Sequence, residues 1–302
     1  MNSGDIVSFF DGSSCGKLAL SRAGISHGNY LASEIDKYAI QVSKKNYPKI
    51  SHIGDITQVK SYYLPMNPFI VMAGSPCQGF SFAGKQLNFK DPRSKLFFNF
   101  VDHLEKIDPK YFLLENVNMK QEYQDEISRI LGVQPIRINS SLVSAQKRDR
   151  LYWTNIPDVS QPDDKEIYLA DIIEHGQTDQ LKSYCIDANY FKGTNLQQYL
   201  KKKRRQIIFN YSSSGRGNGR VESRFYESKK AQTLTGAGYS NRSFTGVYNK
   251  DGIRKLTPIE CERLQTLPDG YTEGVSNTQR YKMLGNGWTV DVVSHILSHI
   301  FK

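Results

Sequence analysis

The 302-residue chain has few cysteines, no long apolar run and no internal repeat. Its four cysteines, at positions 15, 77, 185 and 261, form no Cys-x-x-Cys pair, so neither a disulfide framework nor a thiolate zinc site is expected. No apolar stretch approaches the ~18 residues that span a bilayer, and the first residues lack the basic and apolar regions of a signal peptide. The sequence therefore predicts a soluble cytoplasmic protein with no membrane partner, whose lone thiols are core residues or nucleophiles.

A metal cofactor is not expected either. His295 and His299 are four residues apart, but no Glu follows His295 as the His-Glu-x-x-His pattern requires. Positions on the surface or in the core of a helix explain this pair better than metal ligands.

The excess of positive charge is concentrated in one segment. The chain carries 40 Lys and Arg against 30 Asp and Glu, and residues 201–230 hold ten basic and two acidic residues, a net charge of +8. Small residues between the basic ones suit a segment that follows a phosphate backbone and reaches base edges. A solvated loop beside a charged helix, or an import signal at 201–205, remains open. The candidates for base or phosphate contact are Arg216, Asn218, Arg220, Arg224 and Arg242.

The first 155 residues alternate between expected strands and helices. Strands are predicted at 5–10, 30–33, 68–73 and 111–114, with a helix at about 36–46. This order predicts an α/β fold with a parallel sheet covered by helices on both faces. Ligands of such sheets bind outside the carboxyl ends of the strands, so the Gly-rich turn at 10–16, Glu34, Cys77 and Glu115 should gather at one edge.

The alternation stops at about residue 156. We expect a catalytic domain formed by residues 1–155 and 281–302, and a second, smaller and irregular domain formed by residues 156–280. Helices are predicted at 256–267, opened by Thr257 and Pro258, and at about 290–301.

The turn after the first strand does not fit Gly-x-Gly-x-x-Gly, so a dinucleotide diphosphate is disfavoured. Glu34 at the end of the second strand suits ribose hydroxyls, and Asp55 suits an adenine amino group. Together they favour an adenosine ligand without a diphosphate, such as S-adenosylmethionine, although a purely structural turn remains open.

Three further blocks carry candidate chemistry. Cys77 follows Pro76 on a loop bracketed by glycines, and its thiol is either a nucleophile or an inert core group. Glu115, at a strand end, is a surface charge in a solvated position and a general acid in an apolar pocket. Arg148 and Arg150 alternate in an extended segment, so they point the same way.

These blocks, in this order, resemble the signature of the cytosine-C5 DNA methyltransferases. The residues that carry the resemblance are Pro76-Cys77-Gln78, Glu115-Asn116-Val117, Gln146-x-Arg148-x-Arg150, Phe10-Asp11-Gly12, Gly54-Asp55-Ile56, the segment 254–269 and Gly285-Asn286. They cover the chain apart from the irregular stretch, where this family carries its target-recognition domain.

The resemblance implies a Rossmann-like methyltransferase that acts on a cytosine flipped out of double-stranded DNA. Cys77 would add to C6, a protonated Glu115 would hydrogen-bond N3 and the exocyclic amine, and Arg148 would steady O2. S-adenosylmethionine would supply the methyl group and become S-adenosylhomocysteine, and no metal would be needed.

The resemblance also implies which residues bind cofactor and DNA. The cofactor residues would be Phe10, Gly12, Glu34, Ile35, Asp55, Ile56, Pro76, Leu96, Asn286 and Trp288. Gln78, Ser81 and Arg93 of the loop 78–93 would face DNA, and Arg150 would be a structural or phosphate residue. A monomer associated with the prokaryotic nucleoid is expected, with a restriction endonuclease for the same site as a further partner.

Two other readings remain. The same chemistry on tRNA uses the same Cys and Glu, and only the basic segment favours duplex DNA. A catalytically silent DNA-binding regulator would lack Cys77 or Glu115, and both are present.

Overall fold

A seven-stranded sheet in the order β3-β2-β1-β4-β5-β8-β6 forms the centre of the fold. The computed structural model describes residues 4–75, 95–209 and 253–301. The strands β3, β2, β1, β4 and β5 run parallel to one another, whereas β8 is antiparallel to both β5 and β6. The strands are β1 (Ile6–Phe9), β2 (Tyr30–Ser33), β3 (Ser51–Gly54), β4 (Ile70–Gly74), β5 (Tyr111–Val117), β6 (Ile136–Asn139) and β8 (Asp149–Thr154).

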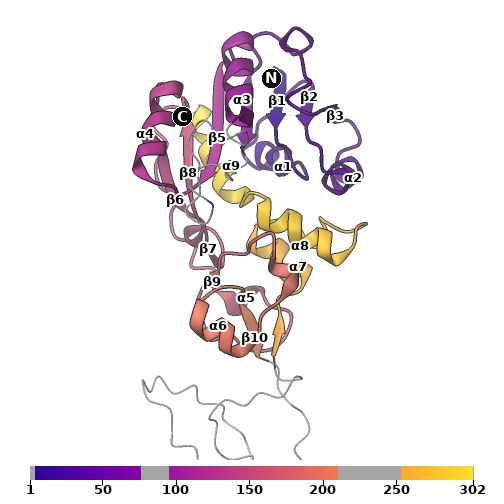
Figure 1. Ribbon diagram of the computed structural model, residues 1–302, viewed down its shortest axis with the longest axis vertical. Coiled ribbons are helices and arrows are strands. Elements are labelled where there is room, and N and C mark those ends of the chain that lie inside the picture. The colour runs from indigo at the N-terminus through magenta and orange to yellow at the C-terminus, as the bar shows by residue number, and fades with distance from the viewer. Residues whose placement is uncertain (1–3, 76–94, 210–252, 302) are drawn as a thin grey trace, which may run out of the picture.

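Helices cover both faces of this sheet because its strands are apolar on both sides. In β4, Ile70 and Met72 face the core that contains α1 and α9, while Val71 and Ala73 face the core that contains α3 and α4. Figure 1 shows these helices on the two faces of the sheet. The helices of this lobe are α1 (Cys15–Arg22), α2 (Lys37–Asn46), α3 (Lys95–Ile107), α4 (Gln121–Leu131) and α9 (Val290–Ser298), with 3-10 turns η1 (Ser61–Tyr63), η2 (Ser140–Leu142) and η4 (His299–Phe301).

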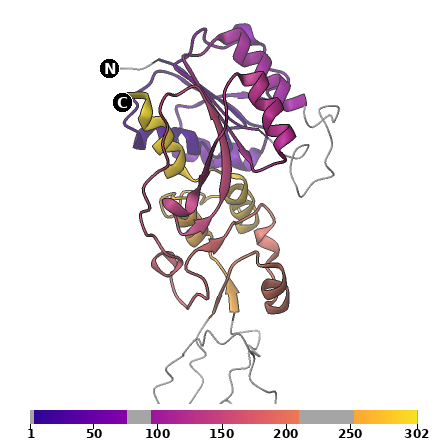
Figure 2. The ribbon, with the colours of Figure 1, turned by 90° about the vertical axis from the view of Figure 1, so that its left-hand side faces the viewer.

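A smaller lobe lies below the sheet (Figures 1 and 2). It contains the antiparallel pair β10–β11, and the parallel pair β7–β9 joins it to the sheet. Its elements, with the helices that connect it to the larger lobe, are β7 (Gln146–Lys147), α5 (Leu169–Ile172), β9 (Ser183–Tyr184), η3 (Tyr190–Lys192), α6 (Leu196–Lys202), β10 (Ile207–Phe209), β11 (Ile253–Lys255), α7 (Pro258–Leu264) and α8 (Asn277–Asn286).

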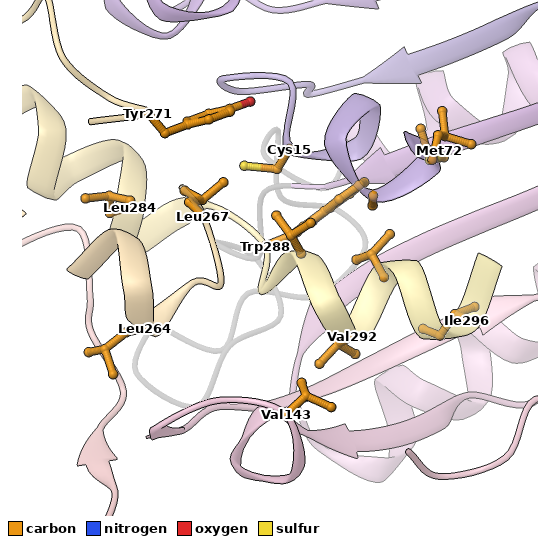
Figure 3. Packing of buried hydrophobic residues seen from close by; sticks show 14 of the residues in the cluster. Cys15, Met72, Val143, Leu264, Leu267, Tyr271, Leu284, Trp288, Val292 and Ile296 are labelled. Atoms are coloured by element: carbon orange, nitrogen blue, oxygen red, sulfur yellow. The ribbon is translucent and has the colours of Figure 1, made fainter. Parts of the chain in front are cut away.

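The two lobes share a hydrophobic core. Leu264 and Leu267, after β11, belong to the same buried cluster as Cys15 of α1 and Val292 of α9 (Figure 3). The hydrophobic core is therefore continuous across the domain boundaries expected at residues 155/156 and 280/281. That division into two domains stays a prediction.

The predicted α/β class is confirmed, and each expected strand and helix is present, although several of their ends differ from the expected bounds by a few residues. The sheet is parallel only from β3 to β5, because β8 runs antiparallel to both of its neighbours. Thr257 caps α7 in a capping box with Glu260, with Pro258 at the first position. One strand is longer than expected: β5 continues to Val117, so Glu115 lies inside the strand and pairs with Tyr152 of β8. No helix in the described ranges is long and apolar enough to cross a membrane.

Candidate active site

The register of the sheet aligns the ends of four neighbouring strands. Gly54 pairs with Ser33, Ser33 with Phe9, and Phe9 with Ala73. The next residue along each strand therefore lies at the same edge, and these residues are Asp55, Glu34, Phe10 and Gly74, the last of which pairs with Glu115. Residues expected to contact cofactor and substrate thus form one row at the carboxyl edge of the sheet, as in other open α/β sheets.

The Glu34 carboxylate is fixed by backbone N–H groups. Oε2 accepts a hydrogen bond from Gly12 N at 2.8 Å, and Oε1 accepts from Ile35 N at 2.7 Å and Asp36 N at 2.8 Å. Each carboxylate oxygen has two acceptor positions, so Oε2 keeps one for a ligand hydroxyl. The neighbouring Ile35 side chain is 73% exposed, which offers an apolar surface beside this acceptor.

The turn between β1 and α1 has an unusual backbone. Phe10, Gly12 and Ser14 have φ values of 56°, 60° and 63°, in the left-handed region that non-glycine residues rarely adopt. Asp11, buried inside the turn, accepts from Tyr30 Oη at 2.6 Å and from Ser14 Oγ at 2.5 Å. Burial raises the pKa of Asp11 from 3.8 to about 6, although these hydrogen bonds oppose the shift. The polar network holds the turn in its strained shape.

Trp288, which is far from β4 in the sequence, packs against the carboxyl edge of the sheet. A Cβ atom added to Gly74 would lie 2.9 Å from Nε1 of Trp288, so the indole packs directly on the last residue of β4. Figure 3 shows Trp288 at the start of α9 near Cys15 and Met72. Glycine is required at Gly74 because the indole occupies the position of a side chain.

The remaining described cofactor candidates differ in exposure. Ile56 is buried, Leu96 (near the start of α3) and Asp55 are half-buried, and Asn286 is exposed. Oδ1 of Asp55 accepts from Thr57 N at 2.8 Å, which leaves Oδ2 for a ligand. Carboxylates on two adjacent strand ends next to apolar side chains fit an adenosine group.

Glu115 and Arg150 form a buried ion pair. Arg150 Nε lies 2.9 Å from Glu115 Oε1, with side chains 14% and 10% exposed. The Nε atom itself is buried, and among the described residues it has an ion-pair contact with Glu115 but no well-aligned hydrogen bond. Burial disfavours the charge of Arg150, but Glu115, Cys185 and Tyr152 together raise its pKa above the ordinary value.

Arg148 lies elsewhere than expected. Its guanidinium is buried and donates to Gly287 O at 2.8 Å, Gly285 O at 3.2 Å and Ile186 O at 3.3 Å. The structure thus brings Arg150, not Arg148, to Glu115, which differs from the roles expected for the two arginines. The alternation of the two arginines does not show which of them lies beside Glu115, because Arg148 falls between β7 and β8 whereas Arg150 lies within β8.

The other expected site residues lie outside the described residues. These are Pro76, Cys77, Gln78, Ser81 and Arg93, and the DNA candidates Arg216, Asn218, Arg220, Arg224 and Arg242. Of the basic segment, Lys201–Arg204 are described and exposed.

The two histidines considered as metal ligands contact the backbone instead. His295 Nε2 lies 2.8 Å from Ser160 O, and His299 Nδ1 lies 2.9 Å from His295 O. Within the described ranges, no group of three or more His, Cys, Asp or Glu side chains is placed to hold a metal ion.

Sequence reasoning missed a buried polar junction next to the site. Gln146 Nε2 donates to Leu264 O at 2.7 Å and to Gln265 Oε1 at 2.9 Å, and Gln265 Nε2 donates to Leu284 O at 2.6 Å. Gln146 belongs to the arginine motif, but only the fold shows which segments it joins.

Comparison with known proteins agrees with this geometry. The sequence model of the C-5 cytosine-specific DNA methylases matches residues 4–131 and 137–302. Type II methyltransferase M1.ScrFI of Lactococcus lactis subsp. cremoris is 31% identical over 88% of this chain and 70% of its own length. Type II methyltransferase M.HhaI of Haemophilus parahaemolyticus is 29% identical over 97% of this chain and 93% of its own length.

The fold has solved counterparts as well. The Entamoeba histolytica methyltransferase EhMeth superposes with a TM-score of 0.72 at 16% identity, covering 100% of this chain and 98% of that one. The S. pombe Dnmt2 methyltransferase gives a TM-score of 0.68 at 17% identity, covering 98% of each chain. The family match spans nearly the whole sequence, so this chain belongs to the C-5 cytosine-specific DNA methylases.

Proposed function

We propose that this enzyme methylates C5 of a cytosine flipped out of a short specific sequence of double-stranded DNA, through a covalent bond between Cys77 and C6. The observation that carries the proposal is the Glu115–Arg150 pair. It lies on β5 and β8 beside Gly74, the last residue of the strand that leads to Pro76 and Cys77.

The cytosine ring is activated by residues of this chain. Glu115 would take up a proton from solvent when the cytosine displaces Arg150 from its carboxylate, and would then donate it to N3. The Cys77 thiolate adds to C6 at the same time, so the ring electrons move to C5 as an enamine. The Arg150 guanidinium, which the sheet holds beside Glu115, would hydrogen-bond O2, where charge builds up during the addition. This proposal gives Arg150 the role that the sequence assigned to Arg148.

S-adenosylmethionine supplies an electrophilic methyl group when bound. The row formed by Phe10, Glu34 and Asp55 would hold its adenosine, with Gly12, Ile35, Ile56, Pro76, Leu96, Asn286 and Trp288 around it. After methylation of C5, solvent water would take up the C5 proton. The electron pair of that C–H bond forms the C5=C6 double bond, and the C6–S bond breaks to release Cys77 as the free thiolate. As a general acid at N3, Glu115 would accelerate the addition of Cys77 to C6 by about 10²–10⁴-fold.

DNA contact is proposed for Gln78, Ser81, Arg93 and the arginines of the basic segment. The relatives' names include type II methyltransferases, which motivates a restriction endonuclease for the same site as a functional partner. DNA from cells expressing this chain would then resist that endonuclease.

A trapping experiment tests the covalent step. Duplexes with a randomised segment carry 5-fluorocytosine in place of cytosine, because fluorine at C5 cannot leave as a proton does. With S-adenosylmethionine, the wild-type chain should form a denaturant-resistant complex, and Cys77→Ser should form none. A complex that forms equally with Cys77→Ser would refute Cys77 as the nucleophile.

A further inference from the structure

A single buried guanidinium joins three segments that are far apart in sequence. Arg148, between β7 and β8, donates to the carbonyls of Gly285 and Gly287 and, through Nη1, to Ile186 O at 3.3 Å. The same Nη1 lies 3.4 Å from Cys185 Sγ. Residue 186 follows β9 of the smaller lobe, Gly285 lies in the last turn of α8, and residues 287–289 connect α8 to α9.

The contact between these segments is tight. A Cβ atom on Gly285 would lie 2.2 Å from the carbonyl carbon of Asp187 and 2.4 Å from the nitrogen of Ala188. The end of α8 therefore touches the backbone of the smaller lobe at the point where Arg148 bonds to both. Any shift of one segment must move the other or break these hydrogen bonds.

Gln265 supports the same turn from the opposite direction. Its Nε2 donates to Gly287 O at 3.2 Å, the carbonyl that also accepts from Arg148, and its Oε1 accepts from Thr289 Oγ1 at 2.8 Å. Gln265 is fully buried, and Arg148 is 3% exposed. Buried polar groups that are all satisfied fix one arrangement of the backbone.

The turn 285–288 that these hydrogen bonds hold lies between the proposed cofactor site and the smaller lobe. It carries Asn286 and Trp288, and the indole of Trp288 rests on Gly74 at the edge of the sheet. We propose that Arg148 is a positioning residue, which locks the turn 285–288 of the cofactor site to residues 185–187 of the smaller lobe. Cofactor binding at that turn then restricts the motion of residues 185–187 of the smaller lobe through Arg148. This inference rests on the proposed cofactor site.

Hydrogen exchange of the wild-type chain without DNA is the first test. S-adenosylhomocysteine should slow amide exchange in peptides covering 283–290, and also in peptides covering 183–190. Protection confined to 283–290 would overturn the proposal. Absence of any binding by the wild-type chain would instead count against the proposed cofactor site itself.

Arg148→Lys and Arg148→Met are the second test, with Arg137→Lys as the matched control because Arg137 pairs with Asp149 on the surface. Calorimetry on variants with wild-type circular dichroism should give a Kd for S-adenosylhomocysteine raised about tenfold, the scale of one charge-assisted hydrogen bond. Protection of 183–190 should disappear in the lysine variant, which keeps the charge but not the planar fork. An unchanged Kd with retained protection, as expected for the control, would contradict the proposal. If neither variant folds, the exchange pattern of the wild-type chain decides.

Discussion

Arg150 Nε lies 2.9 Å from Glu115 Oε1, on strands that the register of the sheet brings together through the pairs Glu115–Tyr152 and Val117–Arg150. In an antiparallel pair, directly opposed side chains lie on the same face, and residues two apart on one strand share that face. The ion pair is therefore a consequence of strand register, and it places a cation beside the carboxylate before any substrate arrives.

Replacement of Arg150 should affect the chemical step more than DNA binding. We expect Arg150→Met to lower kcat by about 10²–10³-fold, the usual loss of one preorganised donor at a developing charge, with a smaller change in KM for DNA. Single-turnover methylation measures this step. Arg137→Met, which removes an exposed arginine, should leave kcat unchanged. An equal loss in both variants would contradict a role of Arg150 at the substrate.

Gly74→Ala should disturb the cofactor edge. The new Cβ would lie 2.9 Å from Trp288 Nε1, and overpacking of this kind costs about 1–3 kcal/mol of folding free energy. Urea denaturation and the Kd for S-adenosylhomocysteine check the result. Ser75→Ala is the matched control, because among the described residues its buried hydroxyl has no hydrogen-bond partner. Similar stability of the two variants would show that Trp288 can move aside.

Asp11 makes stability depend on pH. Its pKa is about 6 in the folded chain against 3.8 ordinarily, so between these values the folded state binds more protons than the unfolded state. The free energy of unfolding then falls as pH rises from about 4 to about 6, by up to roughly 3 kcal/mol from this group. Urea denaturation across this range should show the fall in the wild-type chain relative to Asp11→Asn. Parallel pH profiles of the two proteins would refute the raised pKa.

Two thiols should be inert in the folded chain. Burial raises the pKa of Cys15 to about 11 and that of Cys261 well above its ordinary value, and only the thiolate reacts. In the Cys77→Ser variant, iodoacetamide at pH 8 should label the half-buried Cys185 and leave Cys15 and Cys261 unlabelled until urea is added. Mass spectrometry of the peptides reads this out. Rapid labelling of Cys15 in the folded chain would contradict its burial.

The sequence predicted the sheet well because each strand is a short apolar run that ends in polar residues. Periodicity and end signals gave β2 at Tyr30–Ser33, the same bounds as in the structure, and the cap of α7 at Thr257. The resemblance supplied the family. The motif assigns the role at O2 to Arg148, since it does not show that Arg148 lies between β7 and β8 while Arg150 lies in β8 beside Glu115.

The junction around Arg148 was beyond sequence reasoning for a different reason. Gln146 precedes Gln265 and Gly287 by more than a hundred residues in the sequence. The contacts between these residues form only when the smaller lobe meets the turn before α9. Buried polar residues carry no periodic signal. A close backbone approach such as that at Gly285 shows only as a glycine, which also suits a helix end.

Cytosine methylation of DNA by this chain can be measured by bisulfite sequencing of DNA from a methylation-free host that expresses it, with Cys77→Ser expressed in parallel. We expect protected cytosines at one position of a single short motif with the wild-type chain, and none with the variant. An absence of protected cytosines in DNA, with folded protein that binds S-adenosylhomocysteine, would contradict DNA cytosine methylation by this chain and direct the search to RNA.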